Sequence, residues 1–166
     1  AETQRQAIQN RQDLTQDEKD AAKAKVTQAA ASATKAVEDA ADQNAVTQAK
    51  TNGTTAIAGI TPEAKVRPDA IKEVEAAAEA KKDQISKNKE LTAEEQAKAI
   101  QAVTEAVQNA RNAINGSDTN ALVGTAKEAG LAAIGAIQGE AKSKPAALAA
   151  VAQAAETKKQ GSERNA

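Results

Sequence analysis

Residues 14–37 read LTQDEKDAAKAKVTQAAASATKAV, and residues 91–114 read LTAEEQAKAIQAVTEAVQNARNAI. The second stretch lies 77 positions after the first, and the correspondence runs without a gap from residues 14–82 onto residues 91–159. The chain therefore contains two tandem copies of one unit, a pattern typical of arrays whose units are stabilised by their neighbours. The positions that coincide include Val26 with Val103, Val37 with Ile114, Gly53 with Gly130, Ile57 with Ile134, Pro68 with Pro145, and Val74 with Val151.

The composition removes most of the side chains on which enzymes depend. There is no Cys, His, Met, Trp, Tyr or Phe among the 166 residues. Without Cys or His the chain has no thiolate nucleophile, no imidazole base and no ordinary zinc, copper or haem ligands. Glu94-Glu95 and Glu73-x-Glu75 are pairs of carboxylates, but residues one or two apart on a helix do not face each other. We expect no catalytic, cofactor-binding or metal-binding residues and no enzymatic activity.

The charges are balanced, with 22 basic and 23 acidic residues and a net charge of −1. This balance argues against binding to nucleic acid or to an anionic membrane surface, and no aromatic residue is present to stack on a base. The N-terminus lacks an apolar signal segment, and no stretch is long enough to span a membrane. We expect a soluble piece of a longer protein, because Ala1 aligns with Ala78 inside a predicted helix. Its partners would be neighbouring repeats of the same chain, and the isolated chain would be a monomer.

Each copy begins with a signal for the start of a helix. Thr15-Gln16-Asp17-Glu18 and Thr92-Ala93-Glu94-Glu95 have the form of a capping box, in which a threonine oxygen and a glutamate three residues later satisfy the free amides of the first turn. Leu14 and Leu91 precede these segments as apolar staples. Candidate caps for the next helix are Asp42 in the first copy and Asp118 or Thr119 in the second.

Apolar spacing of three and four residues predicts helices throughout. The row of apolar residues along one face of the helix predicted at 93–115 is less complete in its counterpart at 16–40, where Lys23 stands in the place of Ile100. Gly53 and Gly130 fall on the stripe in mid-helix, which predicts a close helix crossing; shared ancestry of the copies is the alternative. Residues 2–13 are expected to form the tail of a preceding helix. The helices expected after it come in equivalent pairs, one from each copy: 16–40 with 93–115, 43–60 with 120–138, and 69–89 with 146–160. The last of these is expected to fray over residues 160–165.

The supply of large aliphatic residues is thin, with only 23 Ile, Val and Leu side chains. Helices that pack closely through alanine explain this better than a thick globular core. We predict an all-α fold of tandem three-helix bundles that share a continuous linking helix and form an elongated rod. The domains would be 1–13, the tail of a preceding repeat; 14–90, repeat 1; 91–160, repeat 2; and 161–166, a tail.

The linking helix at 69–89 is central to this prediction. Its first half is expected to close the bundle of residues 16–60, and its second half, with Ile85, to pair with the helix that starts at Thr92. The alternative is a set of independent beads with a break near residues 76–81, but that segment contains neither Gly nor Pro.

The order of these landmarks resembles the DUF1542 repeat of Gram-positive cell-wall-anchored surface proteins. The landmarks are an Ile before Leu-Thr-x-x-Glu, then Val-x-x-Ala-Lys-x-x-Gly-x-x-x-Ile-x-x-Ile, and then Pro-x-Ala-Ile. The second copy departs from the first at Gly139 in place of Pro62 and Ser143 in place of Val66. The resemblance implies a helical array between an adhesive region and a wall anchor, in proteins associated with adhesion and biofilm.

The favoured function is a non-enzymatic stalk, secreted and attached to the bacterial cell wall, that projects an adhesive domain. The alternative is that the repeats themselves bind a host or cell-wall ligand or associate with one another. A desiccation protein, disordered in water, is also compatible with the composition, but such chains lack the repeated Leu-Thr, Gly and Pro landmarks.

Overall fold

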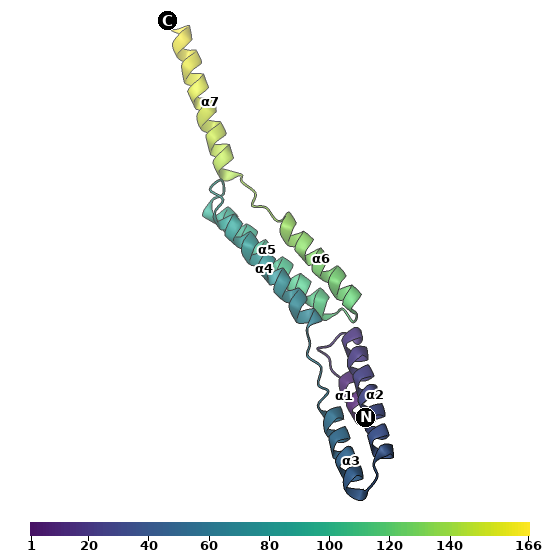
Figure 1. The fold of residues 1–166 in the computed structure, drawn as a ribbon. Coiled ribbons are helices and arrows are strands. Elements are labelled where there is room, and N and C mark those ends of the chain that lie inside the picture. Colours follow the sequence, from purple (N-terminus) through teal and green to yellow (C-terminus); the bar gives the residue numbers. More distant parts are fainter. The chain divides into compact units, whose positions relative to one another are not determined.

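The computed structural model describes all of residues 1–166 and consists of α-helices without any strand (Figure 1). The all-α prediction is confirmed. The helices are α1 (Glu2–Gln9), α2 (Gln16–Asp39), α3 (Gln43–Ala58), α4 (Val66–Ser86), α5 (Ala93–Asn115), α6 (Asn120–Ala136) and α7 (Ser143–Arg164).

The predicted caps begin the helices where the sequence places them. Thr15 and Glu18 form a complete capping box at the start of α2. The carboxylate of Asp42 accepts from the amide of Ala45 at 2.8 Å at the start of α3. Of the two candidates before α6, Thr119 is the one whose hydroxyl accepts from the helix, at 3.2 Å from the amide of Leu122. These local polar contacts satisfy amides that have no partner within the helix.

The chain divides into two compact units, of which unit 1 comprises residues 1–72 and 111–127 and unit 2 comprises residues 73–110 and 128–166. In unit 1, α1 and α3 both pack on α2. Apolar residues from the three helices and the following loop form one core there, and burial of such side chains is the main stabilising contribution to folding. The core contains Ile8, Leu14, Ala22 and Val26, with Ile57, Ile60 and Ala64 packed against it.

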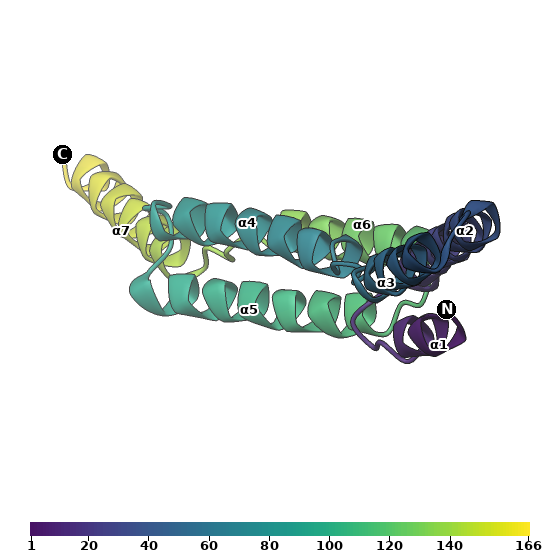
Figure 2. The ribbon, with the colours of Figure 1, turned by 60° about the horizontal axis from the view of Figure 1, so that its bottom comes forward.

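A close helix crossing occurs at the same position of both copies. A Cβ atom built on Gly53 of α3 would lie 2.6 Å from the Cβ of Ala33 in α2, and one built on Gly130 of α6 would lie 2.7 Å from the Cβ of Ala110 in α5. At Gly130 the added atom would also lie 3.6 Å from a methyl group of Val74 in α4. Figure 2 shows α4, α5 and α6 along one another. The predicted close crossing is confirmed.

The linking helix is continuous over Val66–Ser86, as predicted. The partner predicted for its first half is wrong, because Val74 lies against Gly130 of α6 rather than against the bundle of residues 16–60. The physical reason lies in the repeat register: α1 corresponds to residues 79–86 of α4, and α1 already packs on α2 in unit 1.

Several helix boundaries also differ from the prediction, among them the start of α4 and the end of α7. Helix α4 begins at Val66 rather than near residue 69, so that Pro68 is its third residue, where a missing amide costs little. Helix α7 continues through the expected frayed segment to Arg164. Gly161 does not end it, because one glycine inside a helix costs only about 1 kcal/mol.

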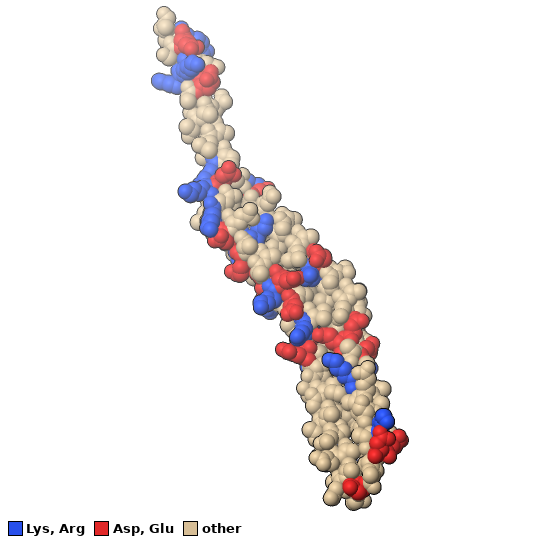
Figure 3. All heavy atoms as spheres, in the orientation of Figure 1, with Lys and Arg blue, Asp and Glu red and all other residues tan.

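Basic and acidic side chains are interspersed on the face seen in Figure 3. None of the seven helices combines the length and the apolar character that a membrane span requires.

Candidate functional site: the Glu18 and Glu95 junctions

The capping glutamates of the two copies each hold two helix starts at once. At the start of α2, one carboxylate oxygen of Glu18 accepts from the amide of Thr15 at 2.9 Å, while the amide of Glu18 donates to the threonine hydroxyl at 3.2 Å. Thr92 and Glu95 repeat these two hydrogen bonds at 2.9 and 3.2 Å at the start of α5. This half of each site is the capping box that the sequence predicts.

The second oxygen of each glutamate reaches the start of another helix. Glu18 accepts from the amides of Lys65 and Val66 at 3.0 and 3.3 Å, where α4 begins. Glu95 accepts from the amides of Lys142 and Ser143 at 3.2 and 2.9 Å, where α7 begins. A carboxylate at the positive end of a helix is also favoured by the helix dipole. Each glutamate therefore ties the beginning of one helix to the beginning of the helix two elements later.

A basic side chain adds a second connection at each site, from the start of the later helix back to the segment before the capping box. Arg67 donates to the carbonyl of Gln12 at 2.7 Å, and Lys144 donates to the carbonyl of Lys89 at 2.6 Å. Both members of the second pair lie 77 positions after those of the first. We call the first set the Glu18 junction (Gln12, Thr15, Glu18, Lys65, Val66 and Arg67) and the second set the Glu95 junction (Lys89, Thr92, Glu95, Lys142, Ser143 and Lys144).

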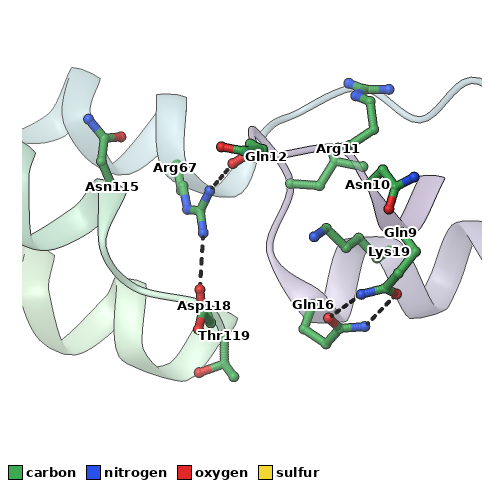
Figure 4. Close-up of a pocket in the computed structure, with 11 residues that line it drawn as sticks. Gln9, Asn10, Arg11, Gln12, Gln16, Lys19, Arg67, Asn115, Asp118 and Thr119 are labelled. Carbon is green, nitrogen blue, oxygen red and sulfur yellow. Dashed lines mark hydrogen bonds and ion pairs between the residues drawn. The ribbon is translucent and has the colours of Figure 1, made fainter. Parts of the chain in front are cut away.

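Arg67 makes further contacts within unit 1. Its guanidinium donates twice to the carbonyl of Ser117, at 3.1 and 2.7 Å, and lies 3.9 Å from the carboxylate of Asp118. The side chain is only about 9 % exposed, so the charge is removed from water and depends on these partners. The planar fork of donors explains why arginine suits a position between two carbonyl groups. Figure 4 shows Arg67 between Gln12 and Asp118.

The turn that precedes α6 is fixed to the start of α2 by three more hydrogen bonds. The amide of Gln16 donates to the carbonyl of Asp118 at 2.7 Å. The hydroxyl of Thr15 donates to the side-chain oxygen of Asn120 at 2.6 Å, and the amide of Asn120 donates to the carboxylate of Asp17 at 2.7 Å. Thr15 is fully buried and uses its hydroxyl both as a donor and as an acceptor. The first copy's α2 and the second copy's turn therefore share one polar network.

The hydrogen bonds of the two junctions lower the pKa values of both glutamates. The amide of Thr92, followed by that of Ser143, lowers the pKa of Glu95 to about 2. Burial raises the pKa of Glu18, but the amides of Thr15, Lys65 and Val66 outweigh it, and the net shift is downward. Both groups are therefore held in the charged form that accepts hydrogen bonds.

A polar cavity of about 710 Å³ lies beside the Glu18 junction in unit 1. Several polar groups of its walls already have partners: the side-chain amides of Gln9 and Gln16 pair at 3.2 Å (Figure 4), and Arg11 pairs at 2.8 Å with Asp13, which lies outside the wall. The structure contains no cluster of three or more His, Cys, Asp or Glu residues that could hold a metal ion. The chemistry of this region is mutual attachment of backbone segments by charged side chains.

Sequence reasoning identified half of each junction. It assigned Thr15, Glu18, Thr92 and Glu95 to local caps, and it gave no role to Arg67 or to Ser117. The signal that could have revealed Arg67 is the basic residue that follows the loop in both copies, Arg67 and Lys144, at the same place in the register, whereas no such signal exists for Ser117.

Comparison with protein families gives one result. The family DUF1542, described as Domain of Unknown Function, matches residues 1–65 and again residues 66–142. The second match is 77 residues long, which is the period of the internal repeat, and its boundary at residue 66 is the first residue of α4. No curated protein and no solved structure matches the chain.

Proposed function

Because the chain belongs to the DUF1542 family, we propose that it is a structural stalk: a set of tandem helical repeats that holds another domain at a distance from the surface of a bacterial cell. The protein would be secreted and attached to the Gram-positive cell wall, in agreement with the family resemblance of its landmarks. The stalk acts by mechanical spacing, without catalysis, in adhesion and biofilm formation.

The observation that carries this proposal is the duplication of the junction contacts. Glu18 and Glu95 make the same four hydrogen bonds, and the amides that each binds through its second oxygen belong to the segment where the next copy begins. A spacer requires each unit to be fixed to the next, since a flexible connection would leave the distance undefined. A carboxylate that caps helices on both sides of the boundary supplies such a fixed connection.

The continuous linking helix supports the same function. Helix α4 has 21 residues and no interruption by glycine, and its one proline lies in the first turn. Repeat arrays in which units contact only their neighbours gain length in regular steps. We therefore expect the repeats to form an elongated rod.

Small-angle X-ray scattering on this chain and on a longer chain tests the proposal. The longer chain carries a second copy of residues 66–142 inserted between residues 142 and 143, which preserves the register because Ser143 is equivalent to Val66. Each added copy should increase the maximum dimension by a constant step of about 35 Å, the length of a 23-residue helix at 1.5 Å per residue.

The matched control carries Glu→Ala substitutions at Glu18, at Glu95 and at the equivalent glutamate of the inserted copy. It should retain its helices by circular dichroism and lose the constant step. A compact particle for the longer chain, or a broad distribution of dimensions without a fixed step, would refute the stalk.

A further inference from the structure

A cavity in unit 1 has walls that are almost entirely polar. It is the cavity of about 710 Å³ beside the Glu18 junction, a volume in the range of small-molecule sites. Its walls come from the end of α1 and the loop after it, the first turn of α2, the start of α4, and the turn between α5 and α6, and all of these segments belong to unit 1. Leu14 is the one apolar residue among those that line it. A ligand in this cavity is therefore held by hydrogen bonds and by charge.

Side-chain amides are the commonest groups of this wall and come from Gln9, Asn10, Gln12, Gln16 and Asn115. Gln9 and Gln16 bind each other. The side-chain amides of Asn10, Gln12 and Asn115, in contrast, have no hydrogen-bond partner in the protein. An amide group carries two donors and an acceptor, and a hydroxyl group likewise both donates and accepts. The wall is therefore suited to a ligand that carries several hydroxyl groups.

One positive charge in the wall has no counter-charge. Arg11 is paired with Asp13 at 2.8 Å. The buried guanidinium of Arg67 is held by carbonyl groups and lies 3.9 Å from the carboxylate of Asp118. The ammonium group of Lys19 has neither a hydrogen-bond nor an ion-pair partner, and in Figure 4 it points from α2 toward the side of the cavity on which Arg67 lies. The wall therefore attracts a ligand with one negative charge.

We propose that this cavity binds an acidic sugar, in which a ring with several hydroxyl groups carries one carboxylate. The carboxylate pairs with the ammonium group of Lys19, and the hydroxyl groups exchange hydrogen bonds with the three free side-chain amides. A phosphate monoester fits less well, because its charge of about −1.5 to −2 at pH 7 exceeds the single free charge of the wall. The site gives the chain a binding function that does not depend on its acting as a spacer.

The second copy indicates that the fold does not require a lysine at position 19. Gln96 stands at the equivalent place in α5, and its side chain donates to the carbonyls of Ser86 and Asn88 at 3.3 and 3.0 Å. The amide at this place therefore uses its donors within the protein, whereas the ammonium group of Lys19 is left for a ligand. Substitution of Lys19 by glutamine introduces the residue that the second copy already has, so we expect the fold to be preserved.

An NMR titration of the isotope-labelled chain with sodium glucuronate, at constant ionic strength, tests the proposal. The side-chain amide signals of Asn10, Gln12 and Asn115 should shift together and saturate. The signal of Asn44, which lies in α3 and outside the cavity, should not move. Lys19→Gln should weaken binding about fivefold, which is the effect of losing a partly exposed ion pair. The same spectra verify that each variant is folded.

Three comparisons make the test specific. Lys25→Gln removes the same charge from α2 outside the cavity, and it should bind like the natural chain. Sodium acetate provides a carboxylate without the hydroxyl groups, and glucose provides the hydroxyl groups without a carboxylate, so that each should bind at least about tenfold more weakly than glucuronate. The proposal is wrong if the three amide signals do not move, if Lys19→Gln binds as tightly as the natural chain, if Lys25→Gln weakens binding equally, or if acetate or glucose binds as tightly as glucuronate.

Discussion

Substitution of Gly130 by alanine has two opposing effects on stability: it raises the helix propensity of the residue, and it adds a methyl group where two helices already touch. Alanine inside a helix is favoured over glycine by about 1 kcal/mol. At Gly130, however, the new methyl group would lie 2.7 Å from the Cβ of Ala110, and neither atom can turn away. Overpacking of this kind costs about 1–3 kcal/mol. We expect Gly130→Ala to range from neutral to a loss of about 2 kcal/mol in the free energy of unfolding.

The matched control lies in the same helix. A Cβ atom built on Gly124 of α6 meets nothing within 4 Å, so that Gly124→Ala should raise the free energy of unfolding by about 0.5–1 kcal/mol. Urea titration followed by far-ultraviolet circular dichroism measures both variants on the same chain. The midpoint should rise for Gly124→Ala and should not rise for Gly130→Ala.

A second substitution identifies the cause. Ala110→Gly removes the methyl group that the new alanine meets, so that it should cost less in the Gly130→Ala background than in the natural chain. If Gly130→Ala gains as much stability as Gly124→Ala, the helices do not approach closely at this point. The reasoning from the glycine would then be wrong for both copies.

Two further substitutions probe the junctions. The pKa of Glu95 is about 2 in the folded chain and ordinarily 4.5, so that its contribution to stability is complete above pH 4.5 and is lost as the pH falls toward 2. The difference in melting temperature between the natural chain and Glu95→Gln should therefore become smaller as the pH falls from 4.5 toward 2. A difference that stays constant over this range would contradict the hydrogen bonds assigned to Glu95. Arg67→Lys should keep the bond to the carbonyl of Gln12, as Lys144 does with Lys89, and lose those to Ser117, at a cost of about 1–2 kcal/mol in urea titration. The reciprocal Lys144→Arg should change the free energy of unfolding by less than about 0.5 kcal/mol. If Arg67→Lys and Lys144→Arg lower the free energy of unfolding equally, the hydrogen bonds from Arg67 to Ser117 do not stabilise the fold.

The features that could be predicted from the sequence are those governed by nearby residues. A threonine with a glutamate three positions later caps a helix through contacts within one turn, and both capping boxes were predicted for this reason. The glycines at the crossings were predicted because a costly residue on an apolar stripe requires a packing reason. The helix type and order follow from spacing that recurs every three or four residues.

The features that could not be predicted depend on residues that meet only in the folded chain. Arg67 and Ser117 are 50 positions apart, and no local pattern links a guanidinium to that carbonyl. The partner of Val74 was mistaken because apolar spacing identifies a buried face without identifying what covers it. The contacts of the loop before α7 could not be predicted either, because they involve residues far apart in the sequence. A side chain at Gly139 would overlap Leu91. The first copy has Pro62 at this position, and its carbonyl accepts a hydrogen bond from Arg11 at 2.9 Å.

Each of Glu18 and Glu95 uses its two carboxylate oxygens to bind amides at the starts of two different helices, which an ordinary capping box does not do. In an isolated helix the glutamate would satisfy amides of its own first turn only, and its loss would be felt within that helix. Here the second oxygen of Glu18 binds the amides of residues 65 and 66, and the family match changes from one copy to the next between these two residues. The same carboxylate therefore stabilises a helix within one family match and the first turn of the helix with which the following match begins. Glu95 stands in the same relation to residues 142 and 143, so that in both copies one carboxylate joins a local helix cap to a contact with amides 47 and 48 positions later in the chain.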